Sequence, residues 1–226
     1  MNKKLYVLIL ATVLTASYAQ AQFSYGVRAG LNISTVVEED NIDRSVYYYY
    51  DVETKFKKGF HIGAVGEYEI NKSFAVQPAI LFTTLGWKRD INASFFSGFS
   101  EGYEENQTIY FNYFQIPVNA LYKSGRGKTK FLLQAGPYLG YALNGKIKKK
   151  IDVGFFADDE EEKLEFGSND DEWNRIDYGF GLGVGLQFNN IQASIGCNVG
   201  LKDFDNHKLV SRSNWALTFS LAYFLQ

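Results

Sequence analysis

The sequence has little of two residue types that build many functional sites. Its 226 residues include 1 cysteine and 2 histidines. A single cysteine excludes a disulfide scaffold and a thiolate zinc cluster, and two histidines leave little material for a histidine-rich metal site. We therefore expect neither a metal nor another cofactor. The 23 basic and 25 acidic residues give a net charge of −2, which lacks the basic footprint of a nucleic-acid-binding protein.

Long hydrophobic runs are also scarce. Beyond the N-terminus, no apolar run reaches the roughly 18 residues that a membrane-spanning helix needs. The N-terminus itself has a basic start, an apolar segment at residues 5–14 and a cleavage site at Ala19-Gln20-Ala21, which are the parts of a secretory signal peptide. We expect residues 1–21 to be removed and residues 22–226 to form the mature domain. The alternative is that the segment remains as a short membrane anchor.

Aromatic side chains and glycine are abundant, and they are arranged with a period of two. Between Ile176 and Phe188, seven apolar side chains alternate with a second row that contains four glycines. Glycine disfavours a helix, and strict alternation is typical of a strand with two unlike faces. None of the apolar-face positions is charged. The same pattern predicts eight strands, at residues 23–33, 60–70, 74–82, 114–122, 131–143, 176–188, 191–201 and 215–225.

The connections between these strands alternate in length. Three are hairpin turns, near residues 71–73, 123–128 and 189–190, and four are long, at about 35–58, 88–108, 144–173 and 202–213. Short periplasmic turns and long external loops are typical of outer-membrane barrels. We therefore predict an all-β fold, an eight-stranded antiparallel up-and-down transmembrane β-barrel in the cell outer membrane. Pro78, Pro117 and Pro137 fall inside these strands, and we expect a bulge or a missing ladder bond near each.

The alternation alone does not decide which face meets lipid. In a soluble, lipocalin-like barrel the apolar face would point inward. The row of alternate glycines between Gly179 and Gly185 would then face water and supply no charge for solubility. An eight-stranded barrel is also too narrow to hold so many large apolar side chains. We therefore expect the apolar rows to face outer-membrane lipid, with aromatic girdles at both strand ends, and the small and polar rows to fill the lumen.

Several short segments carry a family resemblance: residues 26–32, 74–82, 114–118 and 177–181, the pair Gly136-Pro137, and an aromatic C-terminal strand. Through these segments the chain resembles the PorT-like outer-membrane β-barrel family of Bacteroidetes over nearly all of its mature length. The resemblance implies a small, porin-like barrel. Some members of that family are implicated in secretion or adhesion, which leaves open an accessory role in an outer-membrane secretion or transport machine.

Four charged residues share the predicted lumen face, namely Arg28, Glu67, Glu69 and Asp177. Charges inside a narrow barrel must pair, because burying them alone is costly. We therefore expect an ion-pair network that plugs the lumen. Arg28 and Glu67, on neighbouring strands, are the expected main pair, and Asp177 is reachable only across the lumen. The alternative is a narrow channel with a gated path for protons or ions.

The long loops supply the candidate binding surface. Four lysines begin the third long loop, at Lys146, Lys148, Lys149 and Lys150, where they could meet lipopolysaccharide phosphates. Consecutive tyrosines at 47–50 form an apolar, exposed patch for another surface ligand. The alternatives are a plain charged hairpin for the lysines and packing within the loop for the tyrosines.

The remaining candidates for chemistry are weaker. The runs at 158–162 and 170–172 are acidic but lack the ligand spacing of a calcium-binding loop, so we interpret them as solvated. His207 has aspartates and a serine nearby in sequence, but closeness in sequence does not establish a nucleophile and base in contact. We predict no catalytic residue and no enzymatic activity. The predicted function is that of a small barrel with a plugged lumen and a structural or surface-binding role.

Overall fold

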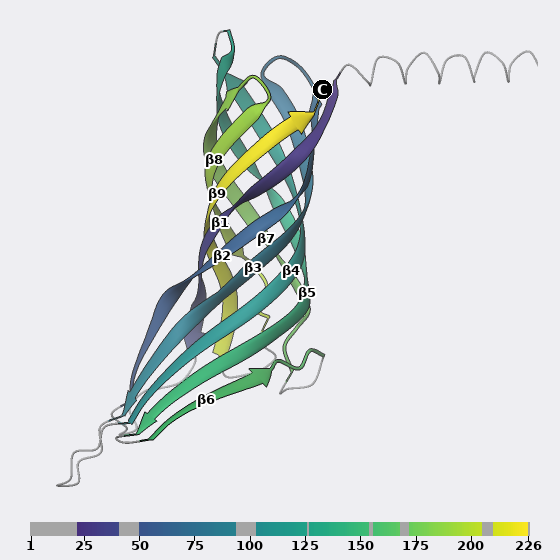
Figure 1. The fold of residues 1–226 in the computed structure, drawn as a ribbon. Helices are drawn as coiled ribbons and strands as arrows, with labels where there is room; N and C mark the ends of the chain where they lie inside the picture. Colours follow the sequence, from purple (N-terminus) through teal and green to yellow (C-terminus); the bar gives the residue numbers. More distant parts are fainter. Residues whose placement is uncertain are drawn as a thin grey trace, which may run out of the picture.

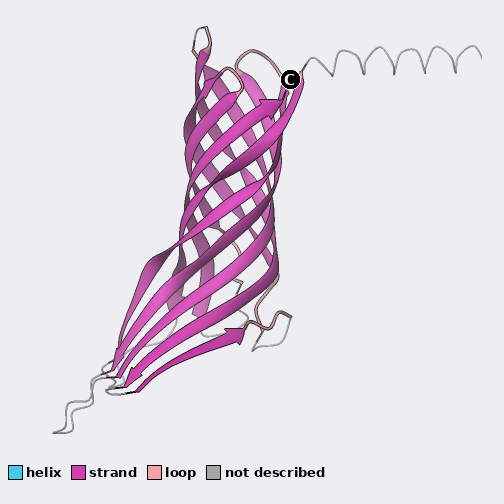
Figure 2. Cartoon of the chain, viewed as in Figure 1, coloured by secondary structure: helices cyan, strands magenta, loops and turns pink. Residues whose placement is uncertain are grey.

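The computed structural model is a tall, twisted barrel of β-strands (Figures 1 and 2). The structure describes residues 22–40, 50–93, 103–125, 127–153, 156–167, 172–204 and 210–225. The predicted signal peptide at residues 1–21 lies outside these residues and stays a prediction. Within the described residues the strands are β1 (Phe23–Asp40), β2 (Tyr50–Glu69), β3 (Phe74–Ala93), β4 (Tyr103–Ser124), β5 (Thr129–Val153), β6 (Phe156–Lys163), β7 (Ile176–Phe188), β8 (Ile191–Gly200) and β9 (Val210–Leu225).

Eight of these strands close into a ring. The hydrogen-bonded order is β4-β3-β2-β1-β9-β8-β7-β5, and β4 also pairs with β5, which joins the two ends of the sheet. Every pair in the ring is antiparallel. β6 lies outside the ring and pairs with Lys146–Val153 of β5. The predicted eight-stranded antiparallel up-and-down barrel is confirmed, with β6 as an additional strand.

The strands on one side of the barrel are longer than the alternation predicted. β2, β3, β4 and β5 contain 20, 20, 22 and 25 residues. They extend as a curved sheet from the end of the barrel opposite the C-terminus (Figure 1). Much of the expected loops at 35–58, 88–108 and 144–173 is therefore strand, which corrects that expectation. The alternation of apolar and polar side chains ends where both faces of the sheet meet water. The hydrogen bonds between the strand backbones do not depend on that alternation, so the strands continue beyond it.

The outer face of the ring is apolar. Along β7, exposed apolar side chains alternate with buried glycines from Tyr178 to Gly183. Leu31 on β1 is 65% exposed although it is apolar. All the remaining ring strands also carry exposed apolar side chains, including Ile62, Ile80, Ile116, Leu133, Val184, Ile195 and Leu221. This apolar belt confirms the predicted orientation, because large aliphatic side chains at so many outward positions need a lipid environment.

The three prolines coincide with interruptions of the sheet. The β3–β4 pairing breaks directly after Pro78 and across Pro117, and the β4–β5 pairing breaks across Pro137. Proline has no backbone N–H to donate, so the ladder cannot be continuous at these positions. The predicted irregularity near each proline is confirmed.

Within the described part of the chain, no helix is long and apolar enough to cross a membrane.

Candidate functional site

A buried polar network fills the end of the barrel near the C-terminus. Glu67 on β2 accepts hydrogen bonds at Oε2 from the side-chain amides of Gln77 and Gln192, each at 2.9 Å. Its Oε1 is ion-paired with Nζ of Lys123. Gln77 also donates to Gln192 at 2.9 Å. These contacts join β2, β3, β4 and β8 across the lumen, and both oxygens of the buried carboxylate are satisfied.

Arg28 joins the polar network through Gln77 and not through Glu67. Its Nη2 donates to Oε1 of Gln77. Among the described residues Arg28 and Glu67 form no direct ion pair, which corrects the expected main pair. The reason is the register of β1 and β2, in which Arg28 lies opposite Gly63 and Glu67 lies opposite Ser24. The offset amounts to about 13 Å along the strands, and the side chain of Gln77 bridges it.

Glu69 extends the polar network to the rim of the barrel. Its carboxylate lies 2.9 Å from Nζ of Lys123 and 3.9 Å from Nζ of Lys130, and its side chain is partly exposed. The structure therefore brings three of the four predicted lumen residues into one network, with Lys123 as the cation that both carboxylates share.

Asp177 lies apart from the polar network, farther along the lumen. It is buried and accepts hydrogen bonds at Oδ2 from Asn214 at 3.0 Å and from the hydroxyl of Tyr138 at 3.4 Å. Asn214 also donates to the hydroxyl of Tyr113 at 3.3 Å. Asp177 is thus held by neutral amide and phenol groups, and its Oδ1 has no partner among the described residues.

Sequence reasoning placed Lys123 in the turn at residues 123–128 and so missed its role. β4 continues to Ser124, and its inward row runs through Asn119 and Leu121 to Lys123. The signal was present in that row. The apolar row of the same strand ends at Tyr122, however, and it is the apolar row that sets the predicted end of the strand.

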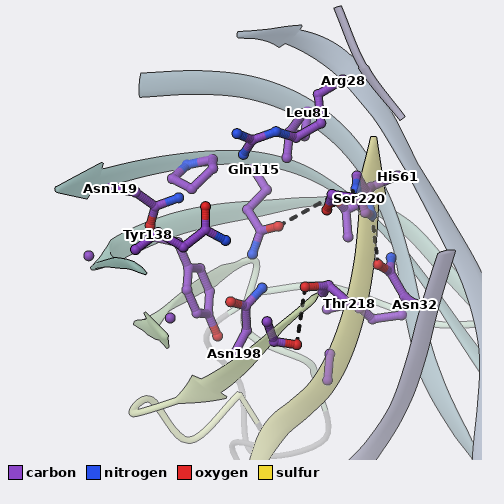
Figure 3. Close-up of a pocket in the computed structure, with 18 of the residues that line it drawn as sticks. Arg28, Asn32, His61, Leu81, Gln115, Asn119, Tyr138, Asn198, Thr218 and Ser220 are labelled. Atoms are coloured by element: carbon purple, nitrogen blue, oxygen red, sulfur yellow. Dashed lines mark hydrogen bonds between the residues drawn. The ribbon is translucent and has the colours of Figure 1, made fainter. Parts of the chain in front are cut away.

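A small cavity lies in the middle of the lumen. Its volume is about 50 Å³, and Figure 3 shows Arg28, Gln115, Asn119 and Asn198 around it. A cavity of this volume has room for a few water molecules. It is far smaller than the clefts that bind drug-sized ligands, which measure roughly 300–1,000 Å³. A lipid chain or a sugar therefore does not fit in it.

A hydrogen-bonded chain centred on His61 forms one wall of the cavity. Nδ1 of His61 is 2.8 Å from Oδ1 of Asn32, and Nε2 is 2.9 Å from Oγ of Ser220. Gly30 makes room for the imidazole, because a Cβ at that position would lie 2.5 Å from the ring. A serine triad has a carboxylate at the place where Asn32 supplies a neutral amide, so this chain does not reproduce an activated serine. No acyl substrate fits beside it, so the chain serves to brace β1, β2 and β9.

An aromatic cluster fills the other end of the lumen, where the extended sheet begins. Trp87 on β3 lies 5.8 Å from Phe111 on β4, which lies 5.9 Å from Tyr113, measured between ring centroids. Phe204, from the connection between β8 and β9, is fully buried and lies 5.9 Å from Trp87. Trp173, from the segment before β7, lies 5.8 Å from Phe204. Residues outside the ring strands thus complete the apolar filling of the barrel.

β5 and β6 form a charged hairpin beyond the barrel. Lys146 and Lys148 lie 3.0 and 3.2 Å from Glu161, and Lys149 lies 3.2 Å from Glu162. Hydrogen bonds from Lys146 and Lys148 lower the pKa of the Glu161 carboxyl below its ordinary value. Of the two interpretations of these lysines, contact with lipopolysaccharide phosphates or a plain charged hairpin, the carboxylate partners within the chain favour the charged hairpin.

Some predicted features lie outside the described residues. They are most of the tyrosine patch at 47–50, the acidic pair at 170–171, and His207 with its neighbour Asp205. Among the residues that the structure does describe, no group of three metal-ligating side chains could hold a metal ion.

A closed ring of eight strands with an apolar belt and a polar interior defines a transmembrane β-barrel of the outer-membrane type. The sequence also matches the family model described as the outer membrane protein beta-barrel domain, over residues 18–206. The chain therefore belongs to this family, and it is located in the outer membrane. The end of the barrel with the short turns and the C-terminus is then the periplasmic end, and the extended sheet is extracellular.

Solved structures of small barrels resemble the chain weakly. Ail, the attachment invasion locus protein of Yersinia pestis, is 13% identical, with 90% of this chain and 99% of that chain covered and a TM-score of 0.34. Ail in complex with the heparin analogue sucrose octasulfate is 15% identical, with the same coverage and a TM-score of 0.35. Neisserial surface protein A is 14% identical, with 88% and 96% covered and a TM-score of 0.40. No curated protein matches the sequence.

Proposed function

We propose that this protein is a non-enzymatic outer-membrane barrel with a plugged lumen, which acts at the cell surface as a structural or ligand-binding element. Within its family we place it with the PorT-like barrels. We also propose that residues 1–21 are a signal peptide and that residues 22–226 form the mature barrel. Outer-membrane lipid then surrounds the apolar belt, and the extended sheet is the part available to an extracellular ligand.

The observation that carries this proposal is the filling of the lumen at two levels. The polar network around Glu67 spans the periplasmic end through contacts of 2.9 Å. The aromatic cluster fills the extracellular end, where the centroids of Trp87 and Phe204 are 5.9 Å apart. Rings at that separation are in van der Waals contact, so water and ions have no passage between them. A barrel obstructed in this way supports a function outside the lumen.

The extracellular sheet supports a surface role. Its β5–β6 hairpin carries a ladder of ion pairs in which lysines on β5 face carboxylates on β6. Because these charges compensate one another, the hairpin does not present a bare cationic surface to phosphate groups. Balanced polar surfaces recognise a ligand by complementary charge placement and register more than by net attraction. We therefore favour a specific surface ligand over general attraction to lipopolysaccharide.

Planar-bilayer conductance tests the plugged lumen. We expect the wild-type protein to give no steady single-channel current. Combining Trp87→Ala and Phe204→Ala with Gln77→Ala and Gln192→Ala should produce channel openings, because these substitutions remove side chains at both levels of the filling. Phe180→Ala is the matched control, since it deletes an aromatic ring from the lipid-facing side of β7, and it should remain silent. Steady conductance by the wild type would instead support the narrow-channel alternative.

The surface role is tested by shortening the extracellular hairpin. Residues 147–162 would be replaced by an Asn-Gly turn, which suits a two-residue hairpin. We expect the variant to insert into the outer membrane and to keep heat-modifiable migration on a gel. Cells carrying the wild type should bind members of a panel of immobilised lipopolysaccharides and glycans, and cells carrying the variant should lose that binding. Equal binding by both would contradict a role for the hairpin.

A further inference from the structure

The cavity in the lumen has an unusual charge environment. Among the described residues that line it, Arg28 is the only arginine, lysine, aspartate or glutamate. The remaining lining consists of amides, hydroxyls, His61 and apolar groups. The carboxylates of the lumen, Glu67 and Asp177, lie beyond its two ends and are not part of its wall. Among the described residues, Arg28 is therefore the one charged group in the wall of the cavity.

The guanidinium of Arg28 is incompletely compensated. Arg28 is 6% exposed, its Nη2 donates to Gln77, and its Nε has no partner among the described residues. A buried charge without a counter-charge in contact is strongly unfavourable. Glu67 does not supply that contact, because its two oxygens are occupied by Lys123, Gln77 and Gln192.

The ion pairs of the polar network do not include Arg28. Glu67 and Glu69 are both paired with Lys123, and Glu69 also lies 3.9 Å from Nζ of Lys130. Among the described residues, the guanidinium of Arg28 therefore has no carboxylate in contact. A monovalent anion in the cavity would supply that counter-charge.

The cavity also offers hydrogen-bond donors of the right kind. Asn119 on β4, Gln134 on β5 and Asn198 on β8 line it, and no described residue is hydrogen-bonded to their side chains. Each carboxamide can turn two N–H donors toward a ligand. Figure 3 shows Asn119 and Asn198 on different sides of the space into which the side chain of Arg28 extends. Amide donors converging from several strands complement an anion next to a guanidinium.

We propose that this cavity binds one small monovalent anion of the chloride and bromide class, held by Arg28 and by the amides of Asn119, Gln134 and Asn198. The volume of about 50 Å³ accepts a halide, with or without a water molecule, and excludes larger anions such as gluconate or a phosphate ester. The anion compensates the buried guanidinium and so stabilises the folded barrel. This inference does not depend on the proposed surface function.

Crystals of the detergent-solubilised barrel soaked in sodium bromide test the site directly. We expect one anomalous difference peak in the cavity beside Arg28. The peak should be absent in Arg28→Gln and in Asn198→Leu. The second variant replaces the amide by an apolar side chain of similar size and leaves Arg28 and Gln77 in place. Lys130→Gln is the matched control, because it removes one positive charge from the polar network without touching the cavity, and it should keep the peak.

Two results would overturn the proposal. One is a wild-type cavity that contains water and no bromide even at a saturating bromide concentration, and the other is a bromide peak that persists in Arg28→Gln. Thermal unfolding in solution keeps the test independent of crystals. At equal ionic strength, the Tm of the wild type and of Lys130→Gln should be higher in sodium chloride or bromide than in sodium gluconate, and the difference should saturate. Arg28→Gln and Asn198→Leu should show no difference between these salts. The same Tm for the wild type in all three salts would also overturn the proposal.

Discussion

Lys123 and Glu67 form an ion pair in the interior of the barrel, where their side chains are only 1% and 3% exposed. The two residues lie on β4 and β2, so the pair crosses the intervening strand β3. Because both charges are removed from water, each depends on the other and on the amides of Gln77 and Gln192. The pair is therefore the point at which the polar network is most sensitive to substitution.

We expect Lys123→Met to lower the free energy of unfolding by about 3–5 kcal/mol, since it leaves a buried carboxylate without its cation. Adding Glu67→Gln should recover most of that loss, because it removes the stranded charge. Urea unfolding in lipid vesicles, followed by tryptophan fluorescence, measures both effects. Lys55→Met is the control: it breaks an exposed pair with Asp90 at 2.6 Å and should cause no measurable change. Equal stability of Lys123→Met and the wild type would contradict the prediction.

Glycine in the lumen-facing row of β7 determines whether large side chains fit inside the barrel. A Cβ at Gly179 would lie 2.7 Å from the ring of Tyr138 and 2.1 Å from the backbone oxygen of Val199. We expect Gly179→Ala to lower the free energy of unfolding by about 1–3 kcal/mol through overpacking. Gly140→Ala is the matched control, because its nearest contact would be an ordinary 3.4 Å. Thermal unfolding midpoints that fall equally in both variants would argue against overpacking as the cause.

The apolar belt makes a prediction about depth in the membrane. Val184 is 46% exposed on β7, near the middle of the strand. We expect Val184→Arg to cost about 2–4 kcal/mol of folding free energy in a bilayer, because it places a charge in the hydrocarbon. Val37→Arg, at an exposed apolar position on the extracellular extension of β1, should be nearly neutral. Folding titrations in vesicles compare the two, and similar costs would contradict the assignment of the belt.

The β5–β6 hairpin should respond to acid. Hydrogen bonds from Lys146 and Lys148 depress the pKa of Glu161 below its ordinary value of 4.5. A depressed folded-state pKa means that the contribution of Glu161 is present above that value and is lost as the pH falls through the lower, folded-state pKa. We expect amide exchange in β6 to accelerate below about pH 4.5, relative to the barrel strands. In Glu161→Gln this acceleration should be smaller, and high salt should weaken it in the wild type.

The sequence predicted the elements that depend on local alternation. β7 was expected at residues 176–188 and is observed at Ile176–Phe188, because glycine and large apolar residues alternate there without a break. The inward position of Arg28, Glu67 and Asp177 followed from the same rule. The lumen-facing sides of the strands could therefore be read directly from the order of residues.

The contacts between those inward residues could not be predicted in the same way. Gln77 and Gln192 meet across the lumen although they are 115 residues apart, and their contact depends on the register and tilt of the whole ring. The burial of Phe204 depends on a connection that carries no alternation at all. Alternation assigns a side chain to a face of its strand, but it does not indicate which side chain on another strand it will meet.

The seam between the first and last strands of the ring has a consequence for biogenesis. β1 and β9 pair from Tyr25 with Leu225 to Asp40 with Val210. The cylinder consequently stays open until β9 has been exported and has paired with β1. A chain that stops before Val210 exposes two unpaired strand edges to hydrocarbon, where each unsatisfied backbone group costs several kcal/mol. Truncated products should therefore fail to insert and should be left to periplasmic proteolysis.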